Sequence, residues 1–72
     1  MSPNGFMREV HLRRLRRGAS VVYHTGLLME DRQRDAEVHS LAKAMWGLQR
    51  MGAIALTQRR MGPVCEYIAT AL

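Results

Sequence analysis

The sequence predicts a small α+β domain whose elements follow the order helix, strand, helix, helix and β-hairpin. Apolar residues recur at three- and four-residue steps between residues 36 and 51, which is typical of one face of a helix. A β-branched and aromatic run at residues 20–24 lies between two glycines, as many strands do. Near the carboxyl end, two further strand-like runs flank a segment with glycine and proline, which indicates a hairpin.

The chain has 72 residues, which is room for one small domain. A core of that size contributes only about 3–5 kcal/mol of stability, and the single cysteine, Cys65, excludes an internal disulfide. We therefore expect either a well-packed core or a stabilising partner surface. A homodimer is the simplest way to supply that surface.

The composition favours a soluble, cytoplasmic protein. No apolar run approaches the roughly 20 residues that span a bilayer. Residues 1–6 lack the basic flank and apolar block of a secretory signal. A lone cysteine also fits a reducing compartment.

The first half of the chain predicts a helix, a strand and a short second helix. Residues 1–5 contain proline, asparagine and glycine, so we expect a flexible lead-in there. A helix is expected at residues 6–17, before Gly18. After the strand, Thr25 is expected to cap a short helix that starts near Leu27. Residues 30–35 are too polar for an interior and form either the exposed end of this helix or the turn after it.

The main helix is expected at residues 36–51, with Asp35 as its N-cap and Gly52 at its end. Its apolar face, which Trp46 borders, consists of Val38, Leu41, Ala42, Met45 and Leu48. The opposite face has no acidic residue and carries His39, Ser40, Lys43, Gly47 and Arg50. A basic stripe on a well-packed helix is a candidate binding surface.

The hairpin is expected over residues 53–70, with strands at residues 53–59 and 64–70. The glycine and proline of residues 60–63 indicate the reversal. This places Arg59 and Arg60 on a flexible tip beyond the end of the sheet.

Charge is the most informative property of the composition. Eleven basic residues and six acidic ones give a net charge of +5, and ten of the eleven are arginines. The balance is +4 over residues 1–28, −1 over residues 29–43 and +2 over residues 44–72. Because the planar arginine side chain suits phosphate and carboxylate groups, the expected partner is a polyanion or an acidic protein surface.

The sequence lacks the motifs of common enzyme sites. It has no P-loop, no GxGxxG, no HExxH and no CxxC pair. The histidines His11, His24 and His39 are thirteen and fifteen residues apart, which is not a metal-ligand spacing. Cys65, inside a strand, is expected to be a small core residue. We therefore expect no enzymatic activity, no cofactor and no metal.

The order of the elements resembles that of the winged helix-turn-helix superfamily. Residues 48–60 (LQRMGAIALTQRR) resemble the passage in which the recognition helix ends at a glycine and continues into the wing. Residues 22–28 (VYHTGLL) and 66–69 (EYIA) are similar to segments of small phage and prophage proteins. The resemblance covers about residues 8–70. It departs from the family in the short acidic segment before the main helix and in the bulky Trp46.

This resemblance implies a DNA-binding protein. The main helix would enter the major groove and bring four side chains near bases or phosphates, namely His39, Ser40, Lys43 and Arg50. The wing would bring Arg59 and Arg60 to the minor groove or to nearby phosphates. Four further arginines would attract the DNA backbone whatever its sequence, namely Arg13, Arg14, Arg16 and Arg17.

Two functional hypotheses remain. The first is a transcriptional regulator of phage or prophage type, dimeric and bound to double-stranded DNA. The alternative is a phage anti-defence protein, similar to anti-CRISPRs, whose arginines bind carboxylates of a host protein or nucleoprotein complex. Both require the cationic side chains to meet on one exposed surface around the main helix and the hairpin tip.

Overall fold

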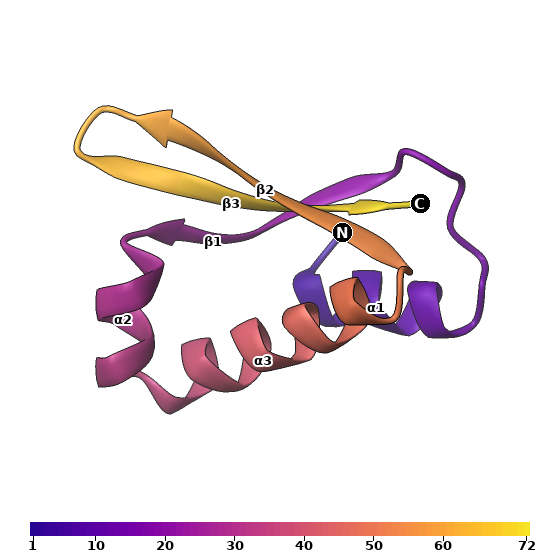
Figure 1. Ribbon diagram of the computed structural model, residues 1–72, viewed down its shortest axis with the longest axis horizontal. Helices are drawn as coiled ribbons and strands as arrows, with labels where there is room; N and C mark the ends of the chain where they lie inside the picture. Colours follow the sequence, from indigo (N-terminus) through magenta and orange to yellow (C-terminus); the bar gives the residue numbers. More distant parts are fainter.

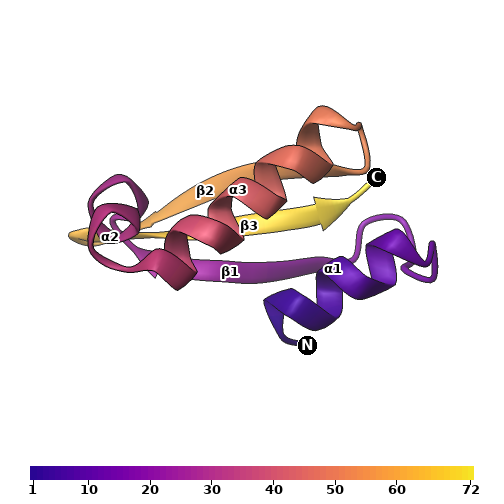
Figure 2. The same cartoon turned by 90° about the horizontal axis from the view of Figure 1, so that it is seen from below.

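The computed structural model describes residues 1–72 as two layers, a three-stranded antiparallel sheet and three helices that all lie on one of its faces (Figures 1 and 2). The elements are α1 (Pro3–His11), β1 (Ser20–Gly26), α2 (Leu28–Arg34), α3 (Ala36–Arg50), β2 (Ile54–Met61) and β3 (Val64–Ala71). The predicted α+β class and element order are confirmed. The other face of the sheet is covered by no helix (Figure 1).

The central strand of the sheet is β3, in the order β1-β3-β2. The hairpin pairs without interruption from Ile54 opposite Ala71 to Met61 opposite Val64. Its reversal is shorter than predicted, because only Gly62 and Pro63 lie between the strands. Gly62 takes a φ of 63°, a left-handed conformation that glycine adopts without strain.

The first strand pairs with β3 from Ser20 opposite Thr70 to Gly26 opposite Cys65. The register shifts between Val22 and His24, so one extra residue forms a bulge. The bulge is the reason that Tyr23 is buried while the neighbouring His24 ring still lies beside Tyr67.

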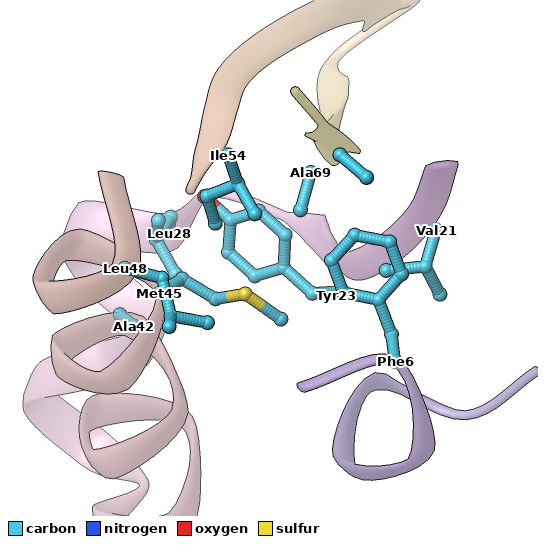
Figure 3. Packing of buried hydrophobic residues seen from close by; sticks show 10 residues of the cluster. Phe6, Val21, Tyr23, Leu28, Ala42, Met45, Leu48, Ile54 and Ala69 are labelled. Carbon is cyan, nitrogen blue, oxygen red and sulfur yellow. The ribbon is translucent and has the colours of Figure 1, made fainter. Parts of the chain in front are cut away.

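One hydrophobic core fills the space between the helices and the sheet. Its ten buried residues are Phe6, Val21, Tyr23, Leu28, Ala42, Met45, Leu48, Ile54, Ala69 and Ala71. Phe6 lies beside Tyr23 and Val21, and the Met45 side chain points toward Tyr23 (Figure 3). The apolar face predicted for the main helix is therefore the face that packs on the sheet.

The first helix begins and ends earlier than predicted. The Ser2 hydroxyl accepts a hydrogen bond from the Gly5 N–H at 3.0 Å, and Pro3 occupies the first turn. Both features start a helix, so the expected lead-in at residues 1–5 is wrong. Arg13 has a φ of 56°, which ends the helical path well before Gly18. Residues 12–19 then form a loop that leads to β1.

Asp35 alone joins α2 to α3. Its carboxylate accepts hydrogen bonds from the Glu37 and Val38 N–H groups at 2.9 and 3.4 Å, as an N-cap does. The prediction of Asp35 as the cap is confirmed. Residues 30–34 belong to α2, which was one of the two expected alternatives, although Asp31 and Arg32 are half-buried and only the other three are exposed.

A hydrogen-bonded cluster fixes the start of α2. The expected Thr25 cap is wrong, because the cap position is Leu27 and its N–H donates to Asp31 Oδ2 at 3.1 Å. The same carboxylate oxygen accepts from His24 Nε2 at 2.7 Å. The Tyr67 hydroxyl accepts from the Leu28 N–H at 3.1 Å. Together these bonds tie β1, α2 and β3 at one end of the sheet.

Replacing Gly26 with alanine should destabilise the fold by about 2–3 kcal/mol, because its φ of 143° strains any other residue and the added Cβ would overlap Asp31 Oδ2. Urea unfolding measures this loss. Gly47→Ala is the matched control, since a Cβ on Gly47 in α3 meets no atom within 4 Å. It should stabilise by about 0.5–1 kcal/mol. Equal effects of the two substitutions would contradict the geometry of this cluster.

Stability should fall in acid through Asp31. The hydrogen bond from His24 is the largest cause that holds the Asp31 pKa below its ordinary 3.8, and the Leu27 N–H adds to it. Because the folded pKa is the lower one, the stabilisation is complete above about pH 4 and is lost as the pH falls through the folded pKa. In Asp31→Asn the free energy of unfolding should therefore fall less steeply as the pH drops below about 4. Glu30→Gln on the same helix should show the same acid dependence as the wild type.

Candidate nucleic-acid interface

The outer face of α3 is a cationic stripe. Ser40, Lys43 and Arg50 are exposed on it, and neither Lys43 nor Arg50 forms an ion pair. Gly47 lies between them, and a Cβ built on it meets nothing. A flat surface could therefore approach the helix backbone closely at this point. Glu37, in the first turn, is the one acidic residue of α3.

Contrary to the prediction, His39 does not belong to this stripe. It is half-buried, and its Nδ1 accepts hydrogen bonds from Arg32 Nε at 3.2 Å and Nη2 at 3.0 Å. The Arg32 guanidinium also lies 4.6 Å from the centre of the Trp46 ring. Arg32, His39 and Trp46 thus form a contact between α2 and α3, so the bulky tryptophan is used for packing on the side of the helix.

The loop at residues 12–19 holds the predicted arginine cluster. Its four arginines are exposed, namely Arg13, Arg14, Arg16 and Arg17. One acidic contact is present, 3.9 Å between Arg14 Nε and Glu9. Arg13 and Leu15 share a cavity of about 480 Å³ with Met51 and Gly52 at the end of α3. The arginine loop and the carboxyl end of α3 are therefore neighbours.

The first helix adds residues that the sequence analysis did not include. Asn4, Arg8 and His11 are exposed and recur at four- and three-residue steps, so they form one stripe along α1. A second cavity between Asn4 on α1 and Ser40 on α3 shows that the two helices lie side by side, as Figure 2 shows. The same periodicity in the sequence could have revealed Arg8 and His11.

The net charge of the protein resides on α1, α3 and the arginine loop, and the loop alone contributes +4. Residues 1–19 and 36–53, which we call the basic helical layer, contain seven cationic and two acidic side chains, a balance of +5. Residues 27–35 contribute −1 and residues 54–72 contribute +1, while β1 has no charged residue other than His24. The basic helical layer therefore carries an excess equal to the whole net charge of +5.

The hairpin arginines lie elsewhere. Arg59 and Arg60 belong to β2 and not to a loop beyond it. Arg59 forms an ion pair with Glu66 across the hairpin, and Arg60 Nε donates to the Gly62 carbonyl at 3.3 Å. The hairpin turn and the arginine loop occupy opposite ends of a molecule whose longest extent is 33 Å (Figure 1). The structure does not bring all the predicted cations onto one surface.

The remaining chemically active side chains are dispersed. His11, His24 and His39 lie on three different elements, and no group of three or more histidine, cysteine or carboxylate side chains gathers as a metal site would. Cys65 is a half-buried free thiol in β3. No helix has the length and apolarity needed to cross a bilayer.

Comparison with known proteins gives no assignment: no family model, no curated protein and no solved structure matches the chain.

Arg32→Ala should cost about 1–2 kcal/mol of unfolding free energy, because it removes the hydrogen bonds to His39 and the stacking on Trp46. Trp46 is the only tryptophan, so its fluorescence also reports the change directly, with emission moving to longer wavelength. Arg34→Ala is the control on the same helix, since Arg34 is exposed and forms no hydrogen bond. If the two variants unfold at the same urea concentration, Arg32 does not hold α2 against α3.

Proposed function

We propose that the protein binds double-stranded DNA through the basic helical layer. The observation that carries the proposal is the concentration of the net charge of +5 on α1, the arginine loop and α3. Lysine and arginine side chains that neutralise phosphates release counterions from DNA, which is the main source of sequence-independent affinity. Because Lys43 and Arg50 have no acidic partner, they are available for this role.

The dimensions of α3 are those of a helix that can enter the major groove. Its 15 residues make a rod of roughly 22 Å, and the groove of about 12 Å width admits a helix. Ser40, Lys43 and Arg50 then face bases or phosphates, and Gly47 permits close approach. The arginine loop, next to the carboxyl end of α3, meets the sugar-phosphate backbone that borders the groove.

On the element order, we propose that the protein is a variant of the winged helix-turn-helix type. Two features set it apart from the DNA contacts implied by that resemblance. The link between α2 and α3 is the single residue Asp35, shorter than the usual three or four. The hairpin extends along the sheet and away from the arginine loop, so Arg59 and Arg60 are not part of the proposed contact (Figure 1). By its resemblance to small prophage proteins, we propose a role in transcriptional regulation.

The double variant Lys43→Gln/Arg50→Gln should weaken binding to a duplex of random sequence about tenfold at 0.1 M salt. The slope of log affinity against log salt should also shrink by about 1.8, or 0.9 for each lost phosphate contact. Fluorescence anisotropy over a salt series measures both. Arg34→Gln/Arg60→Gln removes the same charge outside the basic helical layer and should leave the slope unchanged. Equal losses from both pairs would show that net charge, and not this layer, governs binding.

The alternative, an anti-defence protein that binds a host complex, uses the same cations on an acidic protein surface. An affinity capture from host lysate beside the anisotropy measurement separates the two. Salt-sensitive binding to DNA without a stoichiometric protein partner supports the regulator. A stoichiometric partner together with no affinity for DNA supports the inhibitor.

A further inference from the structure

The outer edge of β2 presents backbone groups that face away from the sheet. β2 is an edge strand, since β3 lies on one side of it only. The Leu56 N–H donates to Gln49 Oε1 at 3.1 Å and so points away from β3. Because backbone direction alternates along an antiparallel strand, the N–H and C=O groups of Gln58 and Arg60 also point outward.

No helix covers this part of the edge. α3 crosses the sheet diagonally, with its carboxyl end near the start of β2 and its amino end toward β1 (Figure 2). The hairpin half of β2 extends past α3 (Figure 1). Gln49 therefore caps the edge at Leu56, while the edge from Gln58 onward is open.

Apolar side chains accompany the open edge. A cavity of about 480 Å³ between the helices and the sheet reaches this edge, where Trp46 of α3, Leu56 and Gln58 of β2, and Met29 of α2 line it; Tyr23 of β1 and Tyr67 of β3 line its inner part. Met29 is 63% exposed and Met61, at the hairpin end of β2, is 45% exposed. An uncovered edge with apolar side chains next to it is a template for a further strand.

We propose that β2 pairs with β2 of a second copy of this chain, antiparallel about a two-fold axis at Gln58, to form one continuous six-stranded sheet. The charges select this register. Pairing Gln58 with the partner's Arg60 would set Arg59 directly opposite the partner's Arg59, which is unfavourable. Pairing Gln58 with the partner's Gln58 separates the two Arg60 residues by roughly 13 Å along the strands.

The backbone groups complete this pairing once one side chain, Gln49, moves aside. The Gln58 N–H donates to the C=O of the partner's Gln58, and the Arg60 N–H donates to the C=O of the partner's Leu56, each twice by symmetry. Leu56 and the partner's Arg60 then form a hydrogen-bonded pair, so the partner's Arg60 C=O replaces Gln49 Oε1 at the Leu56 N–H and the Gln49 side chain turns away from the edge. Arg59 is held by Glu66 and Arg60 by the Gly62 carbonyl, and neither side chain is needed at the edge.

A second copy fits this edge because the pairing is self-complementary and the chain gains from it. Only ten of the 72 residues are buried, a small core for a fold without a disulfide. The two-fold axis is perpendicular to the sheet, so the helices of both protomers lie on the same face. Both basic helical layers then point the same way, although the pairing itself does not depend on DNA binding.

Gln58→Pro tests the pairing, because proline removes the outward N–H and is tolerated where an edge strand faces solvent. Light scattering should show the wild type at twice the mass of one chain and Gln58→Pro at the mass of one chain, with the same circular dichroism spectrum. Thr57→Pro is the contrast. The backbone N–H of Thr57 points toward β3, so its loss should disrupt the sheet and with it the fold.

Amide hydrogen exchange of the wild type gives a measurement that needs no variant. In the proposed dimer the Gln58 and Arg60 amides should exchange at least about 100-fold more slowly than in a monomer, where they face water. A wild type that is monomeric, or a dimer in which these amides exchange as fast as exposed ones, would overturn the proposal. A dimer that survives Gln58→Pro but is lost on Val22→Glu would place the interface on the uncovered face of the sheet and overturn it equally. These outcomes decide only how the protein dimerises, and the DNA-binding proposal is tested separately by the anisotropy measurements.

Discussion

The packing of α3 on the sheet is the constraint on which the rest of the structure depends. Ala42, Met45 and Leu48 lie on one face of the helix and are buried against the sheet. With 3.6 residues per turn, burying that face turns Ser40, Lys43, Gly47 and Arg50 outward. The small side chains of Ala69 and Ala71 on β3 leave room for this packing, and Phe6 completes it from α1 (Figure 3). The orientation of the cationic stripe is thus a consequence of core packing.

The placement of charge follows from the two-layer arrangement. α1, the arginine loop and α3 form most of the helical layer and hold the excess of positive charge, whereas the hairpin arginine Arg59 is neutralised by Glu66. α2 is neutral because Arg32 and Arg34 balance Glu30 and Asp31, and Arg32 contacts His39 and Trp46. Two regions with different properties result. One is a charged helical surface suited to a polyanion, and the other is a strand edge with exposed backbone groups suited to another strand.

The sequence was a good guide where a residue's neighbours along the chain decide its structure. The periodicity of residues 36–51, the Asp35 cap and the β-branched runs all predicted elements that the structure contains. It was a poor guide where distant contacts decide. Asp31 replaces Thr25 at the start of α2 because β1 brings His24 next to it. The bounds of α1 were missed for a local reason, since the prediction did not include the Ser2 cap or the left-handed φ of Arg13. His39 and Arg59 are not part of the site that was predicted for them. Arg32 binds His39 and Glu66 binds Arg59, and each partner is seven residues away along the chain.

The most direct test of the central claim is a titration of isotope-labelled protein with duplex DNA, followed residue by residue in amide NMR spectra. We expect shifts at Arg8, at residues 13–17 and along the outer stripe of α3 at Lys43, Gly47 and Arg50. The amides of the hairpin turn at Gly62 and Val64 should stay in place. Shifts confined to the hairpin or to the uncovered face of the sheet, or no shift at all, would contradict the proposal that the basic helical layer binds DNA.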